Sequence, residues 1–194
     1  TLTGGSALEG YGGGVYCETS SPILERCVLA GNTGVSGGGA ALLAGSSPQF
    51  KSCTFFGNSA AAGAALYADE GSGAIVDRTI VAGSPAGEAV WCATAGSVEL
   101  SCSDVYGNTG GDWVGCISDQ EGVNGNFSLD PLLCNPDSLN FYLQAESPCV
   151  EAPGCGLVGA LPQGCVPQAQ EPDIDVAPLV LEFTAGAREV LCDS

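Results

Sequence analysis

The chain contains no histidine and no methionine, and lysine and arginine account for only 4 of its 194 residues. Without histidine, the Ser-His-Asp and Cys-His catalytic schemes and His-ligated metal sites are excluded. The 22 aspartates and glutamates give a formal net charge of −18 at pH 7. Because this charge repels phosphate, we expect no nucleic acid partner and no attraction to anionic membranes.

The chain also lacks the segments that mark membrane insertion and long helices. It has no run of 18 apolar residues, no signal peptide and no methionine at position 1, so we expect a mature, exported protein without membrane insertion. No window shows apolar residues at helical spacing between two caps, which disfavours α-helices. Thirty glycines and 45% apolar residues suit tight turns around a hydrophobic core.

What the chain does contain is a repeat of 26 residues. The recurring positions are Cys27 and Cys53; Gly31, Gly57 and Gly83; Asn32 and Asn58; and Pro22 and Pro48. Self-similarity at a period of 20 to 50 residues is typical of solenoids, whose units bury their apolar faces only against one another. We therefore expect the function to depend on the surfaces and ends of the stacked repeats and not on a single pocket.

Each unit holds a short apolar run, a turn of Ser, Gly or Pro, a second run with alternating apolar residues, and a closing Gly-Asn or Gly-Ser. The four units span residues 12–33, 37–59, 63–84 and 88–109. Short apolar runs bounded by turn residues predict strands. We therefore predict an all-β parallel coil of about five to six turns, followed by an irregular disulfide-bonded tail and a C-terminal extended strand.

In stacked parallel strands, residues one period apart lie above one another at about 4.8 Å. We predict three inward-facing columns: Leu24, Phe50, Val76 and then Val98 or Leu100; Cys27, Cys53, Thr79 and Cys102; and Leu29, Phe55, Val81 and Val105. A fourth column at a bend is expected to form a structural ladder, with side-chain amides hydrogen-bonded from coil to coil. Its members are Asn32, Asn58, Ser84 and Asn108.

Three of the four basic residues fall on an outward stripe between these columns. Glu25, Lys51 and Asp77 alternate in sign along it, and Arg26 and Arg78 flank them. Each exposed pair of opposite charges contributes about 0 to 1 kcal/mol. A Lys or Arg beside carboxylates is also the arrangement of a polysaccharide lyase, but the ladder explains these residues without chemistry. We therefore predict no catalytic residues and no enzyme.

At this point the motifs resemble a known family. The GGGVY and GGGAA runs, followed by CVLAGN, CTFFGN and SDVYGN, resemble the GGA(I/V/L)…FxxN repeats of right-handed parallel β-helix proteins of bacterial surfaces, including polymorphic membrane proteins and secreted repeat proteins. Residues 55–58 fit FxxN as written, whereas Leu29, Val81 and Val105 replace the Phe and Ser84 replaces one Asn. Residues 128–161 are similar to the tail that often closes such helices. The resemblance implies a right-handed helix and an extracellular, bacterial setting, and no single activity.

The domain organisation we predict is a β-helix with its closing tail over 1–165, a linker over 166–175 and a C-terminal strand over 176–194. The linker is rich in proline and acidic residues. Beyond it, Leu179, Leu181 and Phe183 alternate as in a half-buried strand, in a stretch similar to the first strand of immunoglobulin-like domains. We expect these three residues to form an assembly strand that pairs with a neighbouring copy; the alternatives are that the tail folds back on its own helix or is disordered.

Eleven cysteines without a CxxC pair favour disulfides over metal, and hence an oxidising, extracellular setting. The disulfide candidates, with connectivity left open, are Cys17, Cys27, Cys53, Cys92, Cys102, Cys116, Cys134, Cys149, Cys155 and Cys165. Cys27 would stack within disulfide reach of Cys53, and a bond within a single coil is an equal alternative. Cys192 is left as a free thiol or as a bond to another molecule.

Acidic residues form three small clusters. They are Asp69 with Glu70, Asp119 with Glu121, and Glu171 with Asp173 and Asp175. None has the D-x-D-x-D-G spacing of a loop that binds hard cations. We predict no metal site and no cofactor beyond weakly bound calcium.

Two functional hypotheses follow. The first is a secreted structural β-helix that forms or decorates an extracellular filament or surface layer, through end-to-end stacking of copies and C-terminal strand pairing. The second is an extracellular protein that binds or cleaves a polysaccharide, such as a cell-surface glycan, along its outer face. Tyr16, Tyr67 and Trp91 come near the aromatic row that the second hypothesis requires, but Leu42 interrupts it.

Overall fold

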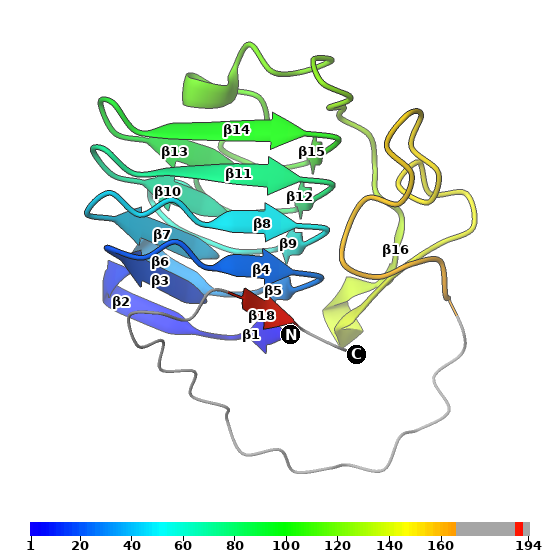
Figure 1. Ribbon diagram of the computed structural model, residues 1–194. Helices are drawn as coiled ribbons and strands as arrows, with labels where there is room; N and C mark the ends of the chain where they lie inside the picture. Colours follow the sequence, from blue (N-terminus) through cyan, green and yellow to red (C-terminus); the bar gives the residue numbers. More distant parts are fainter. Residues whose placement is uncertain (166–188, 192–194) are drawn as a thin grey trace.

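The computed structural model describes residues 1–165 and 189–191 of the chain. It is an all-β parallel solenoid of about four turns, with the strands of successive turns lying above one another (Figure 1). The described residues contain only two short 3₁₀-helices, η1 (Gly115–Ile117) and η2 (Pro136–Ser138). No helix in this part of the chain is long and apolar enough to cross a membrane.

Each coil contributes strands to three parallel sheets, which we call sheets I, II and III. Sheet I has the order β1 (Leu2–Thr3), β5 (Val28–Ala30), β9 (Thr54–Phe56), β12 (Ile80–Ala82), β15 (Asp104–Tyr106). Sheet II has the order β13 (Val90–Cys92), β10 (Leu66–Ala68), β7 (Ala40–Leu43), β3 (Val15–Glu18). Sheet III has the order β14 (Ser97–Ser101), β11 (Gly73–Asp77), β8 (Gln49–Lys51), β4 (Ile23–Glu25), β18 (Glu189–Leu191).

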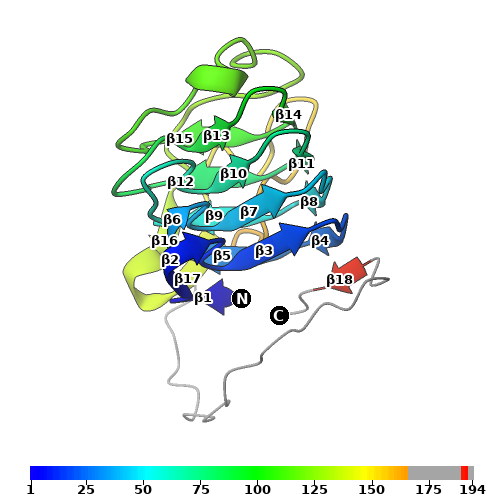
Figure 2. The same cartoon turned by 90° about the vertical axis from the view of Figure 1, so that its left-hand side faces the viewer.

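Two smaller pairs complete the architecture. Strands β2 (Ser6–Tyr11) and β6 (Thr33–Ser36) pair in parallel at one corner of the first two coils. Strands β16 (Leu133–Asn135) and β17 (Asn140–Leu143) form an antiparallel hairpin in the tail. Figure 2 shows the coils from the side, with β18 at the N-terminal end of the stack.

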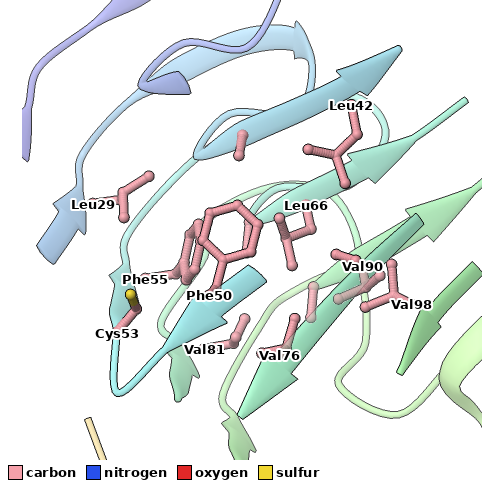
Figure 3. Close-up of a cluster of buried hydrophobic side chains, with 14 of the residues drawn as sticks. Leu29, Leu42, Phe50, Cys53, Phe55, Leu66, Val76, Val81, Val90 and Val98 are labelled. Carbon is pink, nitrogen blue, oxygen red and sulfur yellow. The ribbon is translucent and has the colours of Figure 1, made fainter. Parts of the chain in front are cut away.

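The register of the sheets confirms two of the predicted inward columns. Leu29, Phe55, Val81 and Val105 are direct partners in sheet I, and Leu2 extends this column by one residue at the N-terminal end. In sheet III the column is Leu24, Phe50, Val76 and Leu100. Apart from Leu2, which is partly buried, these side chains are buried, and Figure 3 shows those of the central coils converging inside the stack. Phe50 and Phe55 meet edge to face at 5.2 Å between ring centroids.

The cysteine column is wrong at its last member. The Cys53 N–H donates to Thr79 Oγ1 at 3.1 Å, and the Thr79 N–H donates to Ser103 Oγ at 3.2 Å. Ser103, not Cys102, therefore continues the column. Cys102 instead takes the left-handed turn position with φ of 49° that Arg78 takes one coil earlier. The cause is the shorter fourth unit, in which the pairing of Asp77 with Ser101 shifts the repeat by two residues.

The bend column forms the predicted ladder in two parts, one between Asn32 and Asn58 and the other between Ser84 and Asn108. Asn58 Oδ1 accepts hydrogen bonds from the Asn32 N–H and the Asn32 side-chain amide, both at 3.0 Å. Asn58 and Asn108 donate from their own amides to the carbonyls of Leu29 and Val81 in the coil below. Ser84 lacks an amide, and its N–H donates to Asn108 Oδ1 at 3.1 Å. The ladder satisfies polar groups that the bend buries.

Residues 128–165 pack against the outer face of sheet I and create a second hydrophobic core. This core contains Val28, Ala30, Ile80, Ala82, Leu133, Phe141, Leu143, Cys149, Ala152, Val158 and Ala160. The Ala160 N–H donates to Thr54 Oγ1 at 3.0 Å, and a Cβ at Gly159 would lie only 2.6 Å from the Ile80 side chain. The tail thus adds a layer outside the stack instead of further coils, which is why the number of turns is smaller than the five to six expected.

Candidate functional site

The two ends of the stack differ in how their strand edges are covered. At the C-terminal end, η1 packs on β13 and β14, with Ile117 fully buried and Cys116 bonded to Cys92. The Gln120 side chain takes the place of a further strand: its Nε2 donates to the Val98 carbonyl, and its Oε1 accepts from the Leu100 N–H, both at 2.8 Å. This end is therefore closed against strand addition.

At the N-terminal end, cover comes from the far end of the chain. Strand β18 pairs in parallel with the outer edge of β4, with Glu189 opposite Ile23 and Leu191 opposite Glu25 (Figures 1 and 2). In the neighbouring sheets, β1 and β3 are outermost, and no other described strand pairs with their free edges. Exposed edges of this kind accept additional strands through backbone hydrogen bonds.

The predicted assembly strand is only partly described. Leu179, Leu181 and Phe183, the linker over 166–175, and Cys192 lie outside the described residues. The strand that the structure does describe comes later in the chain, at 189–191, and it pairs with β4 of its own chain. Pairing with a neighbouring copy thus stays a proposal.

Sheet III carries the predicted charge ladder on its outer face. Glu25, Lys51 and Asp77 are direct partners in successive strands, as the repeat predicts. The ion pair recorded in the described part of the chain joins Arg78 to Asp77 at 2.9 Å. Asp77 also accepts a hydrogen bond from Ser101 Oγ at 2.9 Å. Asp77 thus interacts with one basic and one hydroxyl side chain, as expected for a ladder of surface charges.

Sheet II carries aromatic side chains on its outer face, and here the register corrects the sequence interpretation. Tyr16 is opposite Ala41, Ala41 is opposite Tyr67, and Tyr67 is opposite Trp91. Leu42, which we expected to interrupt the row, instead points into the core and is fully buried. The small residue at this position is Ala41.

A fourth aromatic residue, Tyr11, lies beside these three. Tyr11 of β2 contacts Tyr67 with ring centroids 5.6 Å apart, and Tyr67 stacks on Trp91 at 5.0 Å with ring planes 3° apart. Tyr11 and Tyr16 each expose 46% of their surface, while Tyr67 and Trp91 are half-buried. We call Tyr11, Tyr16, Tyr67 and Trp91 the aromatic row. The sequence analysis missed Tyr11 because it precedes the repeat unit and because its partners in the next two coils, Ser36 and Ala62, are not aromatic.

Carboxylates flank the aromatic row. Partial burial, followed by the nearby charges of Glu18 and Asp69, raises the pKa of Tyr16. Asp69 is fixed by the Ala44 N–H, which donates to its Oδ2 at 3.1 Å, and by Ser72 Oγ, which donates to its Oδ1. Glu18 is exposed at the end of β3. The row is thus an amphipathic surface with acidic edges.

Six of the predicted disulfide cysteines form three bonds. Cys92 bonds to Cys116, Cys102 to Cys155, and Cys134 to Cys165. Cys27 is disulfide-bonded as well. The first bond pins the C-terminal cap, the second ties the tail to the fourth coil, and the third joins two parts of the tail. Disulfides favour an oxidising environment.

The other three candidates, Cys17, Cys53 and Cys149, are buried thiols, contrary to the expectation. The strand partner of Cys17 is Leu42, so no second sulfur is adjacent in the sheet. Cys53 donates weakly to the carbonyls of Leu24 and Lys51, each at 3.4 Å. Burial raises the pKa of Cys17 to about 11 and that of Cys53 to about 12. Both are therefore poor nucleophiles and act as small core residues.

A buried acid beneath the tail was missed by the sequence analysis. Asp104 is fully buried in β15, where its Oδ1 accepts the Leu129 N–H at 3.0 Å and its Oδ2 accepts the Cys149 thiol at 3.5 Å. Burial is the main cause that raises the pKa of this carboxyl to about 7. The signal in the sequence was an acid at the position that holds Val28 and Ile80 in earlier coils.

The predicted acidic clusters bring no cation site together. Among the described residues, no group of three or more Asp, Glu, Cys or His side chains is arranged to hold a metal ion. Each Asp69 oxygen accepts one hydrogen bond from the protein, as described above, and Glu70 is exposed beside it. The cluster of Glu171, Asp173 and Asp175 lies outside the described residues.

Comparisons with known proteins assign no family to this chain. No family model, no curated protein and no solved structure matches this chain. The functional argument therefore depends on the geometry of this chain alone.

Proposed function

We propose that this protein is an extracellular structural module, of the type found on bacterial surfaces, which associates with copies of itself through strand addition at its N-terminal end. The observation that carries the proposal is the parallel pairing of β18 with the outer edge of β4. A segment distant in sequence completes this sheet, so the edge is suited to an incoming strand. The alternation of GGG runs and FxxN-like bends supports the resemblance to secreted β-helix repeats, and the disulfides support the location.

The length of chain before β18 allows the strand to reach a neighbour. Residues 166–188 separate the tail from β18 and, by their number alone, can span at most about 75–80 Å. A strand on such a tether can occupy the β4 edge of its own chain or that of a second copy, as in domain swapping. Because the C-terminal end is closed by η1 and Gln120, association through strands is confined to the N-terminal end.

The test compares the full chain with a variant that cannot form the strand. Val190→Pro removes a backbone donor from the middle of β18, and Val190→Ala keeps that donor. By light scattering over a range of concentrations, we expect association of the full chain and of Val190→Ala, and its loss in Val190→Pro and after deletion of residues 168–194. Association that persists in both disabled variants, or a full chain that stays monomeric throughout, would overturn the proposal.

A further inference from the structure

The aromatic row on sheet II has the chemistry of a binding surface that self-association does not use. It lies on a sheet face, whereas strand addition uses the edge of β4 in sheet III. From Tyr16 on β3 to Trp91 on β13, the row crosses three strand spacings, or about 14 Å. Tyr11 and Trp91 each contact the ring of Tyr67, so a ligand would lose little affinity to the ordering of these three side chains.

The charge around the row selects among ligands. Glu18 and Asp69 lie close enough to Tyr16 to affect its phenol. The described basic residues belong to sheet III or its turns: Lys51 lies on β8, and Arg26 and Arg78 directly follow β4 and β11. An acidic polysaccharide would therefore meet carboxylates at the row without a cation to pair with, which costs free energy. Hydroxyl groups, by contrast, can donate hydrogen bonds to those carboxylates.

We propose that the aromatic row binds an uncharged polysaccharide chain lying along the stack. The apolar C–H faces of the sugar rings pack on the exposed parts of the aromatic rings, and the sugar hydroxyls hydrogen-bond with Glu18, Asp69 and the phenol groups. Tyr and Trp suit such a surface because each combines a large rigid apolar area with a polar group. Rings at the same strand position in three of the four coils, with Ala41 in the remaining one, give the surface the length that a polymer chain can occupy.

The experiment measures binding to immobilised hexasaccharides of three kinds: uncharged, amino-bearing and uronic acid-bearing. The chain should bind at least one uncharged hexasaccharide. Tyr67→Ala and Trp91→Ala should each weaken that binding at least 10-fold. The matched control is Tyr106→Ala, because Tyr106 is also an exposed tyrosine (38%) but lies on sheet I, beside a hollow of about 310 Å³ lined by the tail. The affinity of Tyr106→Ala for that hexasaccharide should stay within 2-fold of the affinity of the unaltered chain.

A fluorescence measurement locates the ligand independently of immobilisation. Trp113 lies in the cap region and packs against the main core, so Trp113→Phe leaves Trp91 as the sole tryptophan. Addition of the bound hexasaccharide should shift or quench Trp91 emission in this variant. Circular dichroism confirms that each variant is folded. Absence of binding to every uncharged hexasaccharide, preference for the uronic acid-bearing sugar, or equal loss in Tyr106→Ala would each overturn the proposal, while self-association would stand unaffected.

Discussion

The coils over residues 12–109 and the tail over residues 128–165 bury similar kinds of side chain by different means. In the coils, each core residue lies on the equivalent residue of the next turn, so one register determines every contact. In the tail, contacts are individual: a hairpin, two disulfides and single hydrogen bonds onto the outer face of sheet I. The comparison teaches that repeated contacts between coils make the stack cooperative, whereas the stability of the docked tail depends on separate, non-repeating contacts.

The largest expected effect comes from truncating the same residue type in the two regions. Phe55→Ala opens a cavity in the centre of the stack and should lower the free energy of unfolding by about 3–5 kcal/mol. Phe141→Ala does the same in the core between tail and sheet I. Denaturant unfolding followed by circular dichroism should show loss of the whole stack in the first variant and intact coils with a protease-sensitive tail in the second. Equal loss of the coils in both would contradict the distinction.

The next effect concerns the bond that ties the tail to the fourth coil. Replacing Cys102 and Cys155 with serine opens a link between residues 53 apart and should destabilise the docked tail by about 2–4 kcal/mol. The comparator is the Cys92–Cys116 pair, whose replacement releases the cap at η1 instead. Limited proteolysis should cut within 128–165 only in the first variant. If the two double variants gave the same cleavage pattern, the idea that each disulfide stabilises only its own region would be wrong.

The buried acid Asp104 lies between the fourth coil and the tail and gives the protein a pH-dependent stability. Since the pKa of Asp104 is raised to about 7 in the folded state, its contribution is fully present below the unfolded pKa near 4 and is lost as pH rises through 7. Stability should therefore fall by roughly 2–3 kcal/mol between pH 5 and pH 8. Asp104→Asn should flatten this dependence, whereas Asp137→Asn, at an exposed tail residue, should not. The check is denaturant unfolding at both pH values; an unchanged slope in Asp104→Asn refutes the assignment.

The smallest effect is expected on the charged stripe of sheet III. Lys51→Ala removes the central charge between Glu25 and Asp77 and should change the free energy of unfolding by about 0–1 kcal/mol, an effect that should shrink at high salt because ions screen exposed charges. Lys51→Glu, which makes the column uniformly acidic, should be the more destabilising of the two. Denaturant midpoints at low and high salt measure both. If Lys51→Ala lowered the free energy of unfolding by several kcal/mol, the charged stripe would be a main source of the stability of the coils, contrary to this account.

The structure of the repeating coils could be predicted from the sequence to a greater extent than that of the tail. The 26-residue period predicted the partners of Leu29 and Phe55 because a parallel register repeats without exception while unit length is constant. The prediction failed at Cys102, where the fourth unit is shorter and the period no longer holds. Tyr11 was missed because its column continues as Ser36 and Ala62, so no aromatic repeat marks the position in the sequence.

In the tail, the sequence predicted cysteines and a closing segment, but not their partners. The docking of Cys149 on Asp104, and the close approach of Gly159 to Ile80, depend on the path of the chain after it leaves the stack. No period or alternation describes that path, so only the three-dimensional arrangement reveals it. The same limit applies to disulfides, because spacing along the chain does not determine which sulfurs meet.

Native-state hydrogen exchange tests most directly the claim that the repeat stack and the tail are separate layers. The amides of Ala40 and Ala65 lie within the ladder of sheet II, and those of Leu143 and Gly159 hold the tail. At pH 7 we predict that the first pair exchanges only through global unfolding, while the second opens locally at a lower free energy. Identical exchange free energies for all four amides would contradict this account.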